Sequence, residues 1–210
     1  MADAPIVHRV ADARLPTEHG AFRCLAFQAE GDEETHLALV CGDVAAATAP
    51  VLVRVHSECL TGDVFSSRRC DCGPQLHAAM RMIADAGTGV VVYLCGHEGR
   101  GIGIAHKLRA YELQDEGLDT VDANLELGFP VDDRDYTVGA AILRDLGVGP
   151  VLLLTNNPEK TSSLSAAGIT ISGRLPLVTD VHEDNAAYLR TKQERMGHRY
   201  DPDEEPPPVR

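Results

Sequence analysis

Residues 51–80 read VLVRVHSECLTGDVFSSRRCDCGPQLHAAM, and the rest of the sequence is organised around this stretch. It begins as an apolar strand, carries three cysteines and ends in the first turns of a helix. Cys59, Cys70 and Cys72 follow a C-x10-C-x-C pattern, and no fourth Cys or His lies at the short spacing that completes a structural zinc site. Three thiolates with one open position are typical of a catalytic zinc ion, which lowers the pKa of a bound water to about 7. The spacing therefore predicts a catalytic metal segment.

The composition predicts one globular domain. The chain has 210 residues, 44% of them hydrophobic, and no apolar run is long enough to cross a bilayer. We expect a catalytic domain at residues 1–200 and a disordered acidic, proline-rich tail at residues 201–210, DPDEEPPPVR. Residues 1–5 lack the features of a secretory leader, so we expect a cytoplasmic protein whose cysteines are thiols or metal ligands.

The charge restricts the class of partner. A formal net charge of −13 argues against sequence-independent binding to nucleic acid or to an acidic membrane surface. An anionic ligand would therefore need arginines and lysines that are gathered locally. A nucleobase deaminase is excluded because the H-x-E or C-x-E pair with a following P-C-x-x-C is absent.

Hydrophobic periodicity predicts an α+β or mixed α/β fold in which a β-rich front half, with the metal segment, precedes an α/β half. In the front half, residues 7–20 form a short lead with a bend at residues 15–17. Strands of a largely antiparallel sheet are expected at residues 21–28, 35–41 and 50–55.

In the second half, a helix is expected from Pro74 to near Gly87, and Ile104, Leu108 and Tyr111 are expected to share the apolar face of another. A third helix is expected to begin after the Asn157 cap. The remaining predicted elements are strands at residues 90–94, 151–154 and 176–179 and helices at residues 135–146 and 183–196.

A glycine-rich segment lies between a predicted strand and a predicted helix. It reads HEGRGIG at residues 97–103 and is neither a P-loop nor a dinucleotide fingerprint. Backbone N–H groups at such a junction can bind phosphate oxygens. Because Arg100 lies inside the segment and Lys107 and Arg109 follow it, we expect anion binding there.

Three further clusters have both a functional and a structural interpretation. Residues 54–58, RVHSE, could read the edge of a purine or hold a phosphate, or could form a surface ion pair at a strand end. Residues 132–135, DDRD, fit a solvated turn or a general base beside an arginine. Helix capping explains the asparagines of residues 155–160, TNNPEK, but leaves Lys160 unexplained. Four histidines are expected to be ordinary surface or packed residues: His77, His106, His182 and His198.

These residues resemble GTP cyclohydrolase II, the family that opens the imidazole ring of GTP at the start of riboflavin synthesis. RVHSECLTGD, RCDCG, HEGRGIG, LGFPVDDRDY and LLTNNP occur in the order of the family and are parts of a match over roughly residues 7–198. The resemblance implies an enzyme, a homodimer, and the stand-alone form, since the chain has no residues to spare for the dihydroxybutanone phosphate synthase half of the fused form.

The resemblance also implies roles for single residues. A water on the zinc ion would attack C8 of GTP, and Asp132 matches the proton acceptor. Arg134 matches the proposed nucleophile toward the α-phosphate, and Tyr111 matches a tyrosine near the ring. The metal ligands would be Cys59, Cys70 and Cys72, and the GTP-binding residues would be Arg54, Val55, His56, Ser57, Glu58, Gln75, Glu98, Gly99, Arg100, Thr120, Thr155 and Lys160.

The implied products are formate, pyrophosphate and 2,5-diamino-6-hydroxy-4-(5-phosphoribosylamino)pyrimidine, with one Zn²⁺ per subunit and Mg²⁺ on the triphosphate. Arginine is a poor nucleophile because its pKa exceeds 12, so attack by water with Arg134 as an electrostatic stabiliser stays open. Alternatives are a hydrolase that keeps the formyl group or uses another purine nucleotide, and a non-catalytic zinc and nucleotide-binding module. Cys95 departs from the family pattern, where relatives often carry arginine.

Overall fold

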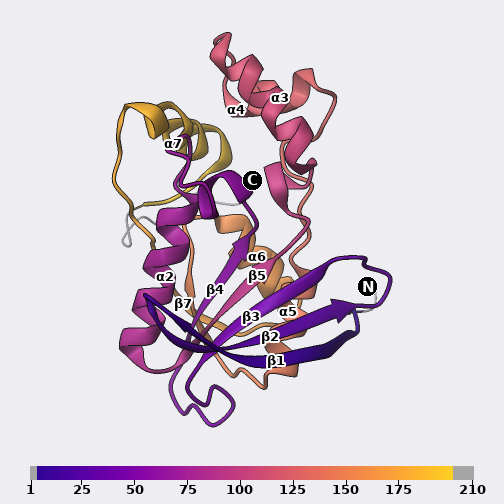
Figure 1. The fold of residues 1–210 in the computed structure, drawn as a ribbon, viewed down its shortest axis with the longest axis vertical. Helices are drawn as coiled ribbons and strands as arrows, with labels where there is room; N and C mark the ends of the chain where they lie inside the picture. The colour runs from indigo at the N-terminus through magenta and orange to yellow at the C-terminus, as the bar shows by residue number, and fades with distance from the viewer. Residues whose placement is uncertain (1–3, 201–210) are drawn as a thin grey trace.

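A seven-stranded sheet with the order β1-β2-β3-β5-β4-β6-β7 forms the centre of the protein (Figure 1). The computed structural model describes residues 4–200, so the predicted tail at residues 201–210 lies outside the described residues. The strands are β1 (Val7–Thr17), β2 (Gly20–Ala29), β3 (Thr35–Cys41), β4 (Val51–Ser57), β5 (Gly89–Leu94), β6 (Val151–Leu154) and β7 (Ile171–Leu175).

The sheet is antiparallel on one side and parallel on the other. Strands β1, β2, β3 and β5 pair antiparallel, whereas β5, β4, β6 and β7 pair parallel. The mixed α/β class is confirmed, but the expectation that residues 50–55 belong to an antiparallel part is wrong. Strand β4 runs parallel to both neighbours because the chain returns to β5 through a helical crossover, which parallel pairing requires.

Helices cover both faces of the parallel half. The helices are α1 (Leu60–Asp63), α2 (Cys72–Ala86), α3 (Gly103–Asp115), α4 (Thr120–Glu126), α5 (Thr137–Asp145), α6 (Pro158–Ala166) and α7 (Glu183–Met196), with a 3₁₀ turn η1 (Glu98–Arg100). Helix α2 packs on one face through Met80 and Ile83, against Phe22 and Val91. Helices α5 and α6 belong to the other core, with side chains of β4, β5 and β6.

Local sequence explains where two of these helices begin and end. Helix α2 stops at Gly87, whose φ of 71° is the left-handed conformation that glycine adopts without strain. Helix α6 starts after Asn157, whose side chain accepts a hydrogen bond from the Glu159 N–H at 3.0 Å, and Pro158 takes the first turn. Both predicted helices are present.

Two predicted elements of the sheet are wrong. Residues 7–17 form a strand and not a lead, because β1 is an exposed edge strand and lacks the alternation that burial imposes. The late strand lies at Ile171–Leu175 and not at residues 176–179. There the chain has left the sheet, and the Leu177 N–H donates instead to Asn156 Oδ1 at 2.8 Å.

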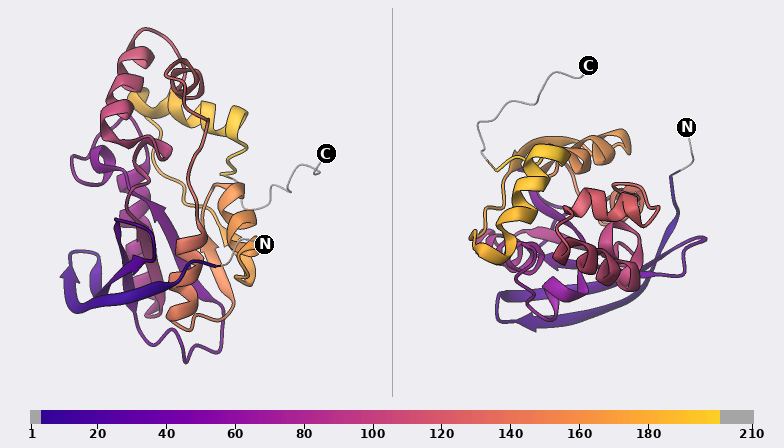
Figure 2. Two further views of the ribbon diagram at one scale, coloured as in Figure 1. Left: turned by 90° about the vertical axis from the view of Figure 1, so that its right-hand side faces the viewer. Right: turned by 90° about the horizontal axis from the view of Figure 1, so that it is seen from above.

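The predicted apolar face of α3 is not buried. Ile104 is 37% and Leu108 49% exposed, because α3 and α4 project beyond the end of the sheet (Figure 1). Figure 2 shows α7 beside these two helices in both further views. Within residues 4–200, no helix combines the length and the apolar character needed to cross a membrane.

Two leucine substitutions test the difference in burial between the apolar side chains of α6 and those of α3. Leu164 in α6 is fully buried, so Leu164→Ala should lower the free energy of unfolding by roughly 2 to 5 kcal/mol through lost burial and a cavity. The matched control, Leu108→Ala in α3, should change it by less than about 0.5 kcal/mol. Urea unfolding followed by circular dichroism measures both values, and an equal loss in the two variants would contradict the packing described here.

Candidate active site

The carboxyl ends of three parallel strands meet at one edge of the sheet. Strand β4 ends at Ser57, β5 at Leu94 and β6 at Leu154, and the register pairs Ser57 with Leu94. The segments that follow these strands carry the cysteines, the glycine-rich turn and residues 155–160. Ligands of open α/β sheets bind at this kind of edge. Two cavities lie there and share Ser57, Cys72, Arg100, Arg134 and Tyr188 in their walls.

The three cysteines form a group that could hold a metal ion. Their Sγ atoms lie within 4.8 Å of one another, and those of Cys59 and Cys70 are 3.7 Å apart. Two glycines allow this approach. A Cβ on Gly62 would lie 2.9 Å from Cys70 Sγ, and a Cβ on Gly73 would lie 2.3 Å from the Gly62 carbonyl oxygen. Among the described residues, this is the one Cys, His, Asp or Glu group with metal-binding geometry.

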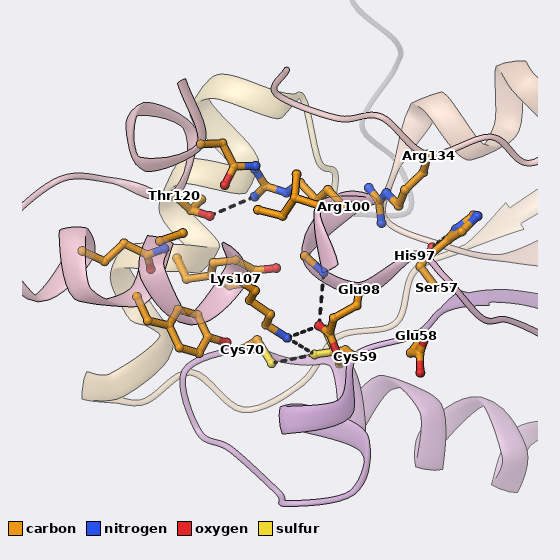
Figure 3. A pocket seen from close by; sticks show the side chains of 18 residues that line it. Ser57, Glu58, Cys59, Cys70, His97, Glu98, Arg100, Lys107, Thr120 and Arg134 are labelled. Atoms are coloured by element: carbon orange, nitrogen blue, oxygen red, sulfur yellow. Dashed lines mark hydrogen bonds and ion pairs between the residues drawn. The ribbon is translucent and has the colours of Figure 1, made fainter. Parts of the chain in front are cut away.

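A buried lysine contributes a positive charge beside the sulfur atoms. Lys107 Nζ lies 3.0 Å from Cys59 Sγ and 2.5 Å from Glu98 Oε1, and Figure 3 shows its side chain extending toward both. Hydrogen bonds from Cys70 and Cys72, together with this ammonium group, hold the pKa of Cys59 well below its ordinary value. Cys59 therefore favours the thiolate, the form of cysteine that binds metals, whereas the hydrogen bonds to Cys59 and burial raise the pKa values of Cys70 and Cys72.

An aspartate fixes the start of the cysteine segment. Asp63 accepts hydrogen bonds from the Cys59 N–H at 3.0 Å and from Tyr93 OH at 2.9 Å, and its oxygens lie 3.1 Å from His56 Nε2. Our sequence analysis missed Asp63. The available signal was its position four residues after Cys59, within reach of the Cys59 N–H in a helical turn.

The first cavity surrounds the cysteine group. Tyr111 OH lies 3.4 Å from Thr61 Oγ1, and the guanidinium of Arg69 lies 4.8 Å from the centre of the Tyr111 ring. On the other side, Arg100 donates to Thr120 Oγ1 at 3.3 Å (Figure 3). The wall of the first cavity contains these residues that the sequence predicted for the site: Ser57, Glu58, Cys59, Cys70, Cys72, Glu98, Gly99, Arg100, Tyr111, Thr120 and Arg134.

The second cavity is rich in cations. Lys160 Nζ donates to the Val55 carbonyl at 2.9 Å, and its pKa is lowered by burial and by the neighbouring charges of Arg54, Arg134 and Lys192. Arg54 donates to the Leu154 carbonyl at 2.9 Å and to Gln75 Oε1 at 2.8 Å. The predicted residues in its wall are Arg54, His56, Ser57, Cys72, Gln75, Arg100, Arg134, Thr155 and Lys160.

Asp132 and Arg134 form a buried pair. Arg134 Nε donates to Asp132 Oδ1 at 2.7 Å, and a terminal guanidinium nitrogen donates to Oδ2. Burial by itself would raise the pKa of Asp132, but the hydrogen bonds and charge of Arg134 more than offset this, so the pKa is lowered. The pKa of Arg134 is raised for the same reason, although burial opposes its charge. Both side chains are therefore ionised at neutral pH.

The predicted site residues do not all lie in one cavity wall. Arg54 and Glu58 line different cavities, and the Val55 side chain lies in the core while its carbonyl faces Lys160. Asp132 lines neither cavity and reaches them through Arg134. Cys95 also lies outside both walls, and burial raises its pKa to about 11.

Besides Asp63, the sequence analysis missed four residues at this edge: Asp71, Tyr188, Lys192 and His198. Asp71 is almost fully buried between two cysteines, and Lys192 Nζ donates to its Oδ1 at 2.8 Å. The i, i+4 spacing of Tyr188 and Lys192 was the available signal, since it puts both on one helix face. His198, expected to be an ordinary surface or packed residue, is buried in the wall of the second cavity.

Comparison with known proteins places the chain among relatives. The model of the family described as GTP cyclohydrolase II matches residues 8–176. The chain is 58% identical over 195 residues to the riboflavin biosynthesis protein RibBA of Mycobacteroides abscessus, which covers 91% of this chain and 47% of the relative. For the protein of the same name from Salinispora arenicola the identity is 58% over 198 residues, covering 94% and 47%. The chain thus spans about half the length of these relatives.

One solved structure shows a weaker likeness. It is the crystal structure of RibBX, a two domain 3,4-dihydroxy-2-butanone 4-phosphate synthase from A. baumannii, with a TM-score of 0.46 and 25% sequence identity. The match covers 83% of this chain and 41% of that one.

A glycine substitution tests the geometry of the cysteine group. Gly62→Ala should weaken zinc binding about 10- to 100-fold, because the added Cβ would displace the Cys59 and Cys70 sulfur atoms, at 3.2 and 2.9 Å. Gly149→Ala is the matched control, since a Cβ there meets nothing within 4 Å. Competition with a chromophoric chelator measures both affinities, and equal affinities in the two variants would show that the close approach is unimportant.

The pH dependence of stability tests the Asp132–Arg134 pair. The pKa of Asp132 is lowered from 3.8 in the folded protein, so the pair stabilises the fold above about pH 4 and loses this contribution as the pH falls through the folded pKa. The difference in unfolding free energy between the unaltered protein and Asp132→Asn should be constant from pH 7 to about 4.5 and shrink below. Asp145→Asn, which breaks the more exposed pair with Arg9, should show only a small difference. A difference for Asp132→Asn that grows on acidification would contradict the assignment.

Proposed function

The chain belongs to the GTP cyclohydrolase II family, and from this premise we propose that it hydrolyses GTP with zinc, opening the imidazole ring and releasing formate from C8 and pyrophosphate. The remaining product is 2,5-diamino-6-hydroxy-4-(5-phosphoribosylamino)pyrimidine, the first committed intermediate of riboflavin synthesis. The observation that carries the proposal is the joining of a three-cysteine group and a cationic cavity through shared walls. One substrate with a purine at one end and a triphosphate at the other suits such a pair of cavities.

The donor set supports zinc as the metal. Three cysteine sulfur atoms suit zinc and leave a position open in a tetrahedral site, and the Lys107 ammonium group offsets part of the charge of three thiolates. When bound, zinc would activate a water molecule for hydrolysis at neutral pH. Glu98 accepts from the Leu60 N–H at 2.6 Å and from Lys107, so we propose that it holds the cysteine segment and the glycine-rich turn in register.

The second cavity supplies the chemistry that a triphosphate needs. Arg54, Arg100 and Lys160 have no carboxylate partner among the described residues. The charges of the two arginines are therefore available to phosphate oxygens, and an anionic ligand would favour the charged form of Lys160, whose pKa burial and neighbouring cations lower. Backbone N–H groups and Thr155 lie at the same sheet edge. Because the described residues contain no carboxylate cluster with metal-binding geometry, we propose that Mg²⁺ arrives with the triphosphate.

We propose that Arg134 stabilises negative charge during release of pyrophosphate and that it is not a covalent nucleophile. The ordinary pKa values of Arg134 and Asp132, 12.5 and 3.8, already make transfer of the guanidinium proton to this carboxylate cost roughly 12 kcal/mol. The pair moves the two pKa values further apart, which raises that cost. Asp132 then orients the guanidinium. If Asp132 is the proton acceptor, it would accept a proton from the substrate or from water and not from Arg134.

The homodimer and the cytoplasmic location stay predictions. Exposed apolar side chains beside and on α4, among them Leu118 and Leu125 at 39% and 51%, are compatible with a contact between subunits.

The decisive experiment scores the two products separately. Zinc-loaded protein incubated with GTP and Mg²⁺ should release formate and pyrophosphate, and Cys70→Ser should abolish formate release because a metal ligand is lost. Cys24→Ser, which changes a cysteine outside both cavities, is the matched control and should leave both products unchanged.

The outcomes separate the alternatives. Pyrophosphate without formate would identify an enzyme that retains the formyl group, and release of neither product despite GTP binding would identify a binding module. Normal formate production by Cys70→Ser would rule out the cysteine group as the catalytic metal site.

A further inference from the structure

The C-terminal segment of the described chain closes the cationic cavity. The match to the family model ends at residue 176, yet Tyr188, Lys192, Met196 and His198 line the second cavity. Figure 2 shows α7, in yellow, beside α3 and α4. Residues 183–198 are therefore part of the wall and not an appendage.

Several contacts hold this segment in place. Lys192 Nζ donates to Asp71 Oδ1 at 2.8 Å, which ties α7 to the loop between two cysteines. Arg195 pairs with Asp119 and Asp122 at 2.5 and 2.9 Å, which ties it to α4. Beyond α7, the Arg199 N–H donates to the Asn156 carbonyl at 2.9 Å. The position of the segment is thus fixed from three sides.

His198 is a buried residue of this wall whose ring has no hydrogen-bond partner among the described residues. Its side chain is buried, with 9% of the residue exposed, and neither ring nitrogen has a hydrogen-bond partner among the described residues. Arg54 Nε, His56 Nδ1 and Asn157 Nδ2, on residues of the same wall, also lack one. Buried polar atoms without a partner are rare and costly, so a cluster of them around one cavity indicates a polar ligand.

The charges around the cavity decide the chemistry of that ligand. Arg54, Arg100, Arg134, Lys160 and Lys192 surround it, and only Arg134 and Lys192 have carboxylate partners among the described residues. Burial and these cations lower the pKa of His198, so its ring is neutral and carries one N–H donor. A ligand with several anionic oxygens would satisfy both the cations and the unpartnered donors.

We propose that residues 183–198 belong to the triphosphate site, with a ring N–H of His198 donating to a phosphate oxygen and Lys192, held by Asp71, contributing its charge beside it. The inference rests on the proposed function and assigns to it a binding residue beyond the end of the family-model match. His198 is the sharper of the two to test, because removing its ring leaves no internal partner unpaired, whereas removing Lys192 would leave Asp71 buried without its partner.

The test compares binding of two probes by zinc-loaded full-length protein. Calorimetric titration with inorganic pyrophosphate and with guanosine should show about tenfold weaker pyrophosphate binding in His198→Ala and unchanged guanosine binding. His198→Gln, which keeps an N–H donor, should recover part of the loss. Tyr200→Phe is the matched control, since it also removes a buried unpartnered polar atom but lies outside the cavity wall.

The failures are distinguishable. If unaltered protein binds pyrophosphate and turns over GTP while His198→Ala matches Tyr200→Phe, this inference is overturned and the proposed function stands. Equal weakening of guanosine and pyrophosphate in His198→Ala would also overturn it, because the effect would then be a general disturbance of the fold. Binding of neither probe and release of no product by unaltered protein would overturn the proposed function and this inference together.

Discussion

The parallel pairing of β4 with β5 and β6 is the constraint on which the site depends. Parallel strands bring their carboxyl ends to one edge, so the segments after Ser57, Leu94 and Leu154 converge although they are far apart in sequence. The cysteines, the glycine-rich turn and residues 155–160 each follow one of these ends. If β4 paired antiparallel, its end would point to the opposite edge and the cysteines would leave the two cavities.

Electrostatics explains why this edge is built from paired charges. A protein with a net charge of −13 gathers buried cations at one place, which is costly unless each finds a partner. Lys107, Lys192 and Arg134 have partners within the described chain: Glu98, Asp71 and Asp132. The charges that remain without a carboxylate line the second cavity, where an anionic substrate can compensate them. The structure therefore contains cations that a carboxylate holds in place, as Asp132 holds Arg134 and Asp71 holds Lys192, and cations without a carboxylate partner among the described residues.

The cysteine group shows the same division of roles. Two glycines allow the loops to approach, Asp63 fixes the backbone of Cys59, and Asp71 connects the group to α7 through Lys192. Such supporting contacts orient metal ligands, and their loss typically weakens metal binding about 10- to 100-fold. Spacing gave only weak signals for Asp63 and Lys192 and none for Asp71, because their partners are distant in sequence or are backbone atoms.

The sequence by itself determined the local features. It determined the cysteine spacing, the cap and proline of α6, the glycine end of α2, the strand β6 and the family motifs, because each depends on residues a few positions apart. Only the tertiary structure decided the parallel direction of β4, the edge strand β1, the exposure of α3, and the meeting of Asp71 with Lys192 or of Val55 with Lys160. These depend on strand pairing and on contacts across roughly half the chain, which no local periodicity records.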